Sequence, residues 1–288
     1  MRSLFFSLLA SAAVACPIAL PPAAAAQQLA PQAAPLSAGS AHFTIVQDKK
    51  TVGSADYTIA ADPGGYLISS RGETQKYHYT FNNANKLDPS LNVVHDQLSG
   101  DVKGSSVTFT MASDSTGRSF QVNIAASGKN TQTTFDRHQR TVLLADLDPA
   151  AYVEMAHFAL QHPPTAWIVI PKGEGVLVPA DYEPQPDAEG SWNGRTATVH
   201  HTSVIVNAQN GITVELYYTD SGDLLEADLP EQNFWIIRDG FDLHNRPKYQ
   251  PPHSSTPPPD QQNQQSQPQG ASPQYQAPQG GYPQLQRQ

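Results

Sequence analysis

Residues 106–124 read SVTFTMASDSTGRSFQVNI, and this stretch decides the fold class. In each half, every second residue is apolar and the residues between are small or polar; the apolar positions are Val107, Phe109 and Met111, then Phe120, Val122 and Ile124. Such alternation is typical of antiparallel strands with one buried and one solvated face. Between the halves lies Asp114-Ser115-Thr116-Gly117, which has turn chemistry. The stretch therefore predicts a β-hairpin.

The same pattern recurs along the chain. Residues 212–219 alternate again, and turn-forming residues occur at 62–65, 210–211 and 220–222. Short turns pair strands that are neighbours in sequence. We therefore expect residues 39–246 to form a single, mostly β domain, built as a curled antiparallel meander or open half-barrel.

One segment predicts a helix instead. Asp148 and Pro149 are a favourable N-cap and first-turn pair, and helix-forming residues continue to Gln161, ahead of Pro163. The apolar residues of this segment wrap nearly all sides, so one α-helix near 149–161 should be covered on more than one side, by the concave face of the sheet. Residues 167–170 follow as an apolar run typical of a strand buried on both faces.

The two ends of the chain differ from this domain. Residues 1–26 have a positive charge, a short apolar core and an Ala-rich end, which predict a signal peptide cleaved after Ala26 and a periplasmic or secreted protein. The alternative is lipidation at Cys16, which would anchor the mature chain. Residues 27–38 are expected to be a flexible leader, and the Pro/Gln-rich residues 247–288 a disordered tail.

Composition excludes several function classes. The net charge is −9 with no run of basic residues, which argues against nucleic acid and anionic membranes as partners. Cleavage after Ala26 would remove the one cysteine, and with it thiol catalysis, disulfides and cysteine metal sites. We expect no transmembrane segment in the mature chain, no metal and no cofactor.

A resemblance emerges from the strand and turn patterns taken together. The segments that carry it are 51–57, 195–198, 214–218, 220–225 and Leu229-Pro230. They resemble uncharacterised bacterial exported proteins whose curled antiparallel sheet is similar to that of the lipoprotein carriers LolA and LolB. The resemblance implies an open half-barrel with a hydrophobic cavity and a helix at its mouth, and it brings no catalytic residue. The carriers close their barrel with several helices, whereas only one can be placed here.

Several short motifs match catalytic or metal-binding signatures, but each is better explained as an element of structure. Asp220-Ser221-Gly222 matches an aspartic-protease signature, but it lies between alternating strands as a turn does. His157 and His162 are five residues apart, and His200 and His201 are adjacent in a strand, so neither pair shares a face. The charged residues at 136–140 read as a loop, and Lys172-Gly173-Glu174-Gly175 as a hairpin between Ile170 and Val176.

The functional prediction is an exported, non-enzymatic protein that binds a lipid or acyl chain. The candidate ligand-binding residues are Tyr152, Met155, Phe158 and Trp167, because ligand sites are mostly apolar; packing of the core is the alternative. A cell-envelope scaffold that meets a partner protein through the tail is a second hypothesis, and an unrecognised hydrolase a third.

Overall fold

The computed structural model describes residues 35–161, 165–209 and 211–246. The expected signal peptide, most of the leader and the tail lie outside these residues. The chain divides into two units, Met1–Asn245 and Arg246–Gln288, and every element below belongs to the first.

The described part of the first unit is built almost entirely from strands, with one α-helix. In chain order the elements are β1 (Gly39–Gln47), β2 (Lys50–Asp62), β3 (Gly65–Thr74), β4 (Tyr79–Leu87), β5 (Val93–Val102), β6 (Ser105–Ser113), β7 (Ser119–Ala126), β8 (Lys129–Asp136), β9 (Thr141–Leu143), α1 (Pro149–Ala159), β10 (Ala166–Ile170), β11 (Val176–Trp192), β12 (Arg195–Val206), β13 (Ile212–Tyr218), β14 (Leu224–Leu229), the 3-10 turn η1 (Pro230–Gln232), β15 (Phe234–Arg238) and β16 (Phe241–Leu243).

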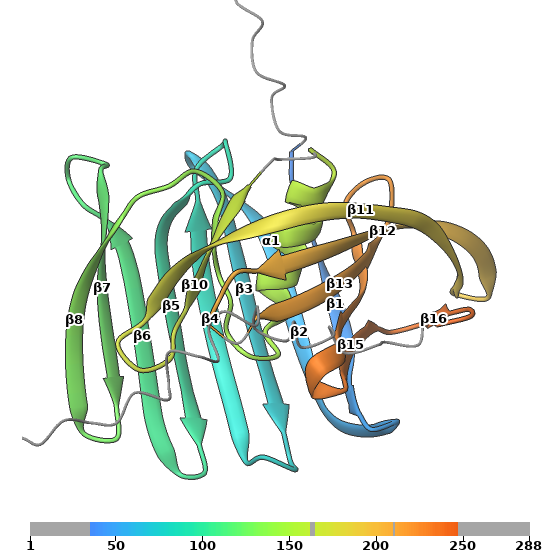
Figure 1. Cartoon of the computed structure of the whole chain (residues 1–288), viewed down its shortest axis with the longest axis horizontal. Helices are drawn as coiled ribbons and strands as arrows, with labels where there is room; N and C mark the ends of the chain where they lie inside the picture. The colour runs from blue at the N-terminus through green and yellow to red at the C-terminus, as the bar shows by residue number, and fades with distance from the viewer. Residues whose placement is uncertain (1–34, 162–164, 210, 247–288) are drawn as a thin grey trace, which may run out of the picture. The chain divides into compact units, whose positions relative to one another are not determined.

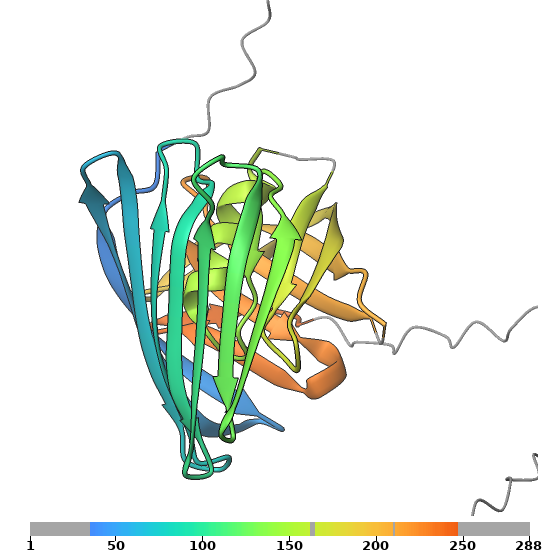
Figure 2. The ribbon, with the colours of Figure 1, turned by 90° about the vertical axis from the view of Figure 1, so that its left-hand side faces the viewer.

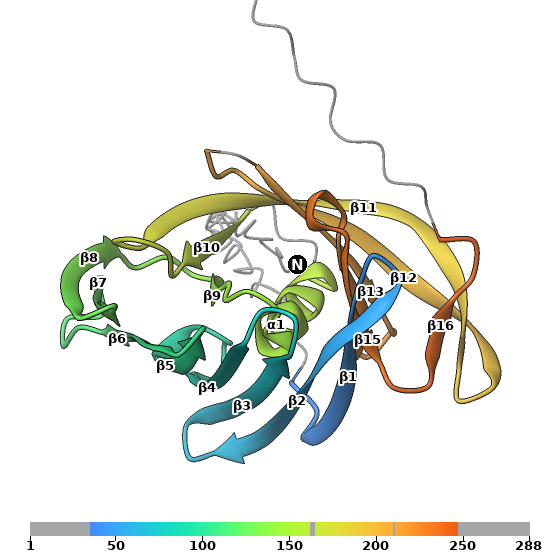
Figure 3. The same cartoon turned by 90° about the horizontal axis from the view of Figure 1, so that it is seen from below.

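All strands belong to one 16-stranded sheet (Figure 1). β1 to β8 form an antiparallel meander, and β15 back to β10 continue it from the other side of β1. Three pairings depart from the expected antiparallel pairing of sequence neighbours: β1 pairs with β15, β11 pairs with β16, and β9 lies parallel to β10. The sheet curls round on itself without closing (Figure 3). The predicted mostly β, curled and open architecture is confirmed.

The alternation in sequence decides which face of the sheet is buried. On β6, Phe109 and Met111 are fully buried while Thr108 is exposed, and β7 repeats this arrangement. Figure 2 shows the long strands β3 to β8 as one broad wall with α1 behind it. Their apolar faces therefore line the interior of the curl.

The far side of the sheet differs from the expectation of one solvated face per strand. Tyr217 on β13 points away from the main core and is nevertheless only 1% exposed. It packs in a second apolar cluster with Val199, Leu225, Phe241 and Leu243. The short strand β16 pairs with the end of β11 and supplies Phe241 and Leu243 to this cluster on the outer face.

The helix lies inside the curl, as predicted. Asp148 is the N-cap, Pro149 starts the helix, and every helical residue is buried. The helix ends at Ala159, two residues before the predicted Gln161, and it contacts β2, β3, β9, β13 and β14. Figure 3 shows α1 enclosed by the strands. A helix apolar on nearly all sides is stable here because the sheet surrounds it.

The predicted hairpin between Ile170 and Val176 is confirmed as the β10–β11 connection. Gly175 lies in this connection with a φ of +79°, where a Cβ would come within 3.3 Å of Ile124 and 3.4 Å of Phe135. Glycine thus allows the connection to approach β7 and β8 closely. At this point the β10–β11 connection therefore packs against side chains of β7 and β8.

Candidate ligand-binding cavity

The four candidate residues from the sequence lie in the core or against a neighbouring ring. Tyr152 and Met155 are fully buried on α1, and Phe158 is 1% exposed. Trp167 on β10 is half-buried and stacks on the His138 ring, with 3.7 Å between the ring centroids. None of the four lines the cavity described next.

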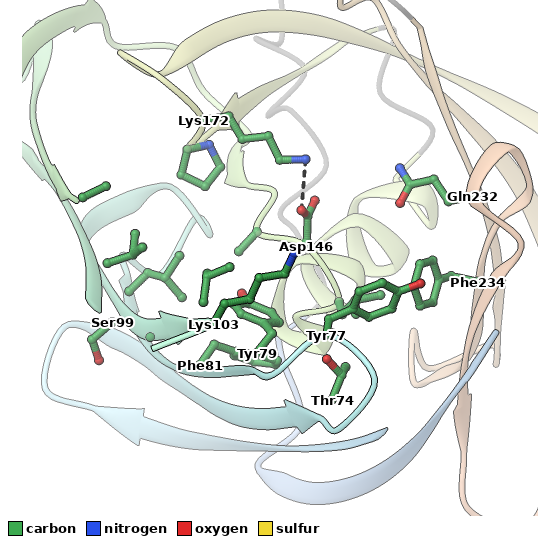
Figure 4. Close-up of a pocket in the computed structure, with 18 of the residues that line it drawn as sticks. Thr74, Tyr77, Tyr79, Phe81, Ser99, Lys103, Asp146, Lys172, Gln232 and Phe234 are labelled. Carbon is green, nitrogen blue, oxygen red and sulfur yellow. Dashed lines mark ion pairs between the residues drawn. The ribbon is translucent and has the colours of Figure 1, made fainter. Parts of the chain in front are cut away.

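A cavity of about 660 Å³ lies at the N-terminal end of α1 (Figure 4). Its walls come from β3 to β7, from the loop between β9 and α1 at residues 145–147, from the β10–β11 connection, and from Phe234 on β15. Val102, at the end of β5, lines the cavity and is 41% exposed, so the cavity reaches solvent beside the β5–β6 hairpin.

Aromatic rings form much of the cavity wall. Tyr79 and Phe81 on β4 stack with 5.6 Å between their centroids. Tyr77, in the β3–β4 turn, packs against Phe234 of β15 at 5.9 Å. The remaining apolar lining is aliphatic and includes Leu98, Val107, Ala126, Ala145, Leu147 and Pro171. Such a lining offers dispersion contacts to an apolar ligand.

Tyr79 adds a hydroxyl to this wall without adding charge. Burial raises the pKa of the Tyr79 phenol, and the nearby carboxylates of Asp148 and Asp146 raise it further. The phenol therefore stays neutral, and the ring meets a ligand as an apolar surface with one polar atom.

Polar side chains gather where the cavity opens. Gln47, at the end of β1, accepts hydrogen bonds from Lys76 Nζ at 2.6 Å and from the Tyr77 hydroxyl. Lys76 also lies over the Tyr77 ring, 5.3 Å from its centroid. These contacts hold Tyr77 in place against Phe234.

Two lysines and one aspartate complete the opening. Lys172 Nζ lies 3.0 Å from Asp146 Oδ2. Lys103, at the tip of the β5–β6 hairpin, extends toward the same carboxylate in Figure 4, but it has no ion pair within 4.0 Å among the described residues. The described residues of the cavity lining therefore carry a net charge of about +1, in a chain of net charge −9.

Buried hydrogen bonds fix the helix end that borders the cavity. Asp148 Oδ1 accepts from the Ala150 amide at 2.9 Å and from Ser70 Oγ at 2.6 Å, and its Oδ2 accepts from Asn83 Nδ2 at 2.8 Å. Ser70 and Asn83 belong to β3 and β4. The N-cap therefore ties the helix, and residues 145–147 beside it, to the wall of the sheet.

Two further carboxyl groups lie behind this anchor, in the interior. Glu154 Oε1 accepts from Asn85 Nδ2 at 2.6 Å, and burial raises the pKa of Glu154 to about 8. Asp96 on β5 is fully buried, and neither of its carboxylate oxygens has a hydrogen-bond partner among the described residues. Burial raises the pKa of Asp96, and Glu154 and Asp148 raise it further. These groups are more easily protonated than exposed carboxylates, and they do not line the cavity.

The remaining motifs lie away from the cavity. Asp220-Ser221-Gly222 is in the β13–β14 turn, with Asp220 Oδ1 2.7 Å from His200 Nε2. His201 Nε2 lies 2.8 Å from Glu215 Oε2, and His162 lies outside the described residues. Arg137 donates to the Val93 carbonyl from the loop before β9.

The described residues were also compared with the requirements for a membrane-spanning helix. Across residues 35–161, 165–209 and 211–246, no helix combines the length and the apolar character needed to cross a bilayer.

The sequence interpretation missed the cavity lining, although part of its signal is visible. Tyr77, Tyr79 and Phe81 recur with period two, which predicts three aromatic rings on one face of a strand. Which end of the curl these rings border depends on pairings between distant segments, above all β1 with β15.

Comparisons with known proteins find a structure with a similar fold, and they indicate no activity. No family model matches the chain, and no curated protein is similar to it. Among solved structures, the chain is similar to a crystal structure described as a β-barrel-like protein of a domain of unknown function, DUF1849, from Brucella abortus. The two share 10% sequence identity with a TM-score of 0.44, over 73% of this chain and 99% of that one.

Proposed function

We propose that this protein binds a hydrophobic ligand, a lipid or an acyl chain, in the cavity beside the N-terminus of α1, and that it does so outside the cytoplasm. The observation that carries the proposal is the cavity itself. Its volume of about 660 Å³ falls within the range of roughly 300–1,000 Å³ found for small-molecule sites. Its lining is aromatic and aliphatic, with polar groups confined to a few positions.

The surroundings support binding over simple packing of the core. The Tyr77–Phe234 pair and the Tyr79–Phe81 stack hold rings from separate strands around one space. Asp148 fixes the neighbouring helix end through three hydrogen bonds. A site whose walls are held in place by contacts of their own loses little entropy when a ligand enters.

This proposal assigns the predicted ligand-binding residues of α1 a structural role. Tyr152, Met155 and Phe158 pack the core around α1 and support the cavity from behind, without contact with the ligand. The Pro/Gln-rich segment 247–288 lies outside the described residues, and the proposal for this site rests on described residues alone.

Two neighbouring residues on β6 provide a matched test. Val107 lines the cavity, whereas Thr108 points to the opposite face and is exposed. Nile red, a neutral dye that fluoresces in apolar surroundings, should bind saturably to the purified protein. Val107→Trp fills the cavity and should weaken dye binding by about tenfold or more, which corresponds to about 1.4 kcal/mol. Thr108→Trp should leave it unchanged.

Circular dichroism and a thermal melt would establish that both variants fold. If Val107→Trp does not fold, Ala126→Phe, which adds a ring at another lining position at the end of β7, serves the same purpose. Wild-type affinity in a folded, cavity-filled variant would contradict the proposal.

A further inference from the structure

The strand order gathers lysines at the cavity end of the sheet. In an antiparallel meander, alternate connections lie at the same end. The β1–β2, β3–β4, β5–β6 and β7–β8 connections therefore meet at one end, the lower end in Figure 1. Among the residues that the structure describes, all lysines except Lys86 lie in these connections, at the strand ends beside them or in the β10–β11 connection: Lys49, Lys50, Lys76, Lys103, Lys129 and Lys172.

The sequence has no run of basic residues, but the topology places lysines that are far apart in sequence at one end of the sheet. Carboxylates share this end, however, and balance most of the lysines: Asp48, Asp101, Asp146, Glu174 and Glu231. Asp48 lies 4.0 Å from Lys76, and Asp146 pairs with Lys172. The end as a whole is nearly neutral, which gives no basis for attraction to a broad anionic surface such as a membrane.

The balance between lysines and carboxylates differs at the cavity itself. Among the described residues, its lining includes Lys103 and Lys172 but one carboxylate, Asp146. Lys172 is 62% exposed and Asp146 52% exposed, so their ion pair is accessible to solvent and contributes little stability. A ligand anion can therefore replace the Asp146 carboxylate beside Lys172 at small cost, while Lys103 approaches from the other wall (Figure 4).

We infer that the ligand is an anionic amphiphile, whose apolar chain lies between the aromatic walls and whose head group lies between Lys103 and Lys172. This inference rests on the proposed function and deepens it. The head-group chemistry is a compact anion, a carboxylate or a phosphate, because two ammonium groups at an open mouth recognise charge without the planar geometry that arginine imposes. A neutral or cationic head group would leave Lys103 without a partner.

A head-group series on one chain tests the inference. Hexadecanoate, hexadecyl phosphate, hexadecanol and hexadecyltrimethylammonium, each below its micelle concentration, would compete with Nile red for the purified protein at low salt. At least one of the two anions should bind about tenfold tighter than the alcohol and the cation, as expected for a charge-assisted contact. The two anions compared with each other distinguish a carboxylate from a phosphate.

Three sets of variants locate the effect. Lys103→Gln together with Lys172→Gln should abolish the preference for anions while hexadecanol binding is retained. Asp146→Asn frees Lys172 and should increase anion affinity. Lys129→Gln is the matched control, because Lys129 is an exposed lysine at the same end that does not line the cavity.

The outcomes separate the two proposals. Equal binding of all four compounds would overturn the anionic head group and leave the hydrophobic site standing. An equal loss of anion preference in Lys129→Gln would also overturn it, since the cause would then be the general field of this end. Displacement of the dye by none of the four would contradict the proposed function as well.

Discussion

Asp148 Oδ1 lies 2.6 Å from Ser70 Oγ, so the N-cap of α1 is bonded to the sheet that surrounds the helix. Both residues are buried, and Asn83 donates to the other carboxylate oxygen. The residue that starts the helix in the local sequence therefore also fixes the position of the helix against the sheet. Since residues 145–147 line the cavity just before the helix, the same contact positions one cavity wall.

Asp148→Ala should lower the free energy of unfolding by about 2–4 kcal/mol, because it removes an N-cap and leaves two buried donors unsatisfied. Asp148→Asn keeps an acceptor for Ala150 and Ser70 and should lose less than half as much. Urea unfolding of the two variants provides the measurement. Loss of less than about 0.5 kcal/mol in Asp148→Ala would show that the anchor is unimportant.

Stability should fall as pH rises toward alkaline values. The folded pKa of Glu154 is raised to about 8, above its unfolded value, so its favourable contribution is fully present below about pH 4.5 and is lost as the pH rises through about 8. The raised pKa values of Asp96 and Asp148 act in the same direction.

Glu154→Gln isolates the part that comes from Glu154, because the amide oxygen still accepts from Asn85 and no longer titrates. The fall in melting temperature between about pH 5 and about pH 9 should be smaller than in the wild type by several degrees. Glu183→Gln, at an exposed position on β11, is the control and should not change the slope. An unchanged slope in Glu154→Gln would remove this group as a cause.

Gly72→Ala should disturb both the core and the cavity. A Cβ at this position would lie 2.6 Å from two atoms of the Phe81 ring and 2.9 Å from Ala55 Cβ. The forced shift should cost about 1–3 kcal/mol of unfolding free energy. Because Phe81 lines the cavity, Nile red affinity should fall too.

The control for Gly72→Ala is Gly39→Ala, where a Cβ would meet nothing within 4 Å. It should retain both the stability and the dye affinity of the wild type. A Gly72→Ala protein that matches it in both measurements would show that Phe81 has room to move.

Met155→Ala distinguishes the core from the ligand site. Met155 is fully buried on α1 and does not line the cavity. Truncation should lower the free energy of unfolding by about 2–5 kcal/mol while the folded protein retains its affinity for the dye. A weakening as large as that caused by Val107→Trp would instead restore Met155 as a ligand contact.

Much of the fold can be predicted from local sequence. The alternation at 106–124 predicts β6 and β7, and Asp148-Pro149 predicts the start of α1, because strand faces and helix caps depend on neighbouring residues. The burial of the helix follows from its apolar residues. The pairing of Phe43 with Arg238, which joins β1 to β15, depends on contacts between distant segments and has no local signal.

The candidate site is harder to predict for the same reason. The residues of α1 are the strongest apolar signal in the sequence, but a helix that the sheet surrounds uses them for packing. Net charge is an average over the chain, so it says nothing about where the lysines lie. The order of the hairpins does carry this information, because alternate turns of a meander place Lys49, Lys76, Lys103 and Lys129 at one end.

Locating a bound ligand on the chain would show whether the cavity beside α1 is the binding site. Hexadecanoate that carries a photoreactive diazirine near the end of its chain would be bound to the protein, irradiated, and mapped by mass spectrometry of proteolytic fragments. We expect labels on the cavity lining, within residues 98–107 and 145–147, that unlabelled hexadecanoate suppresses and that Val107→Trp abolishes. Labels on Trp167 or on the outer face of the sheet, with residues 98–107 unlabelled, would contradict it.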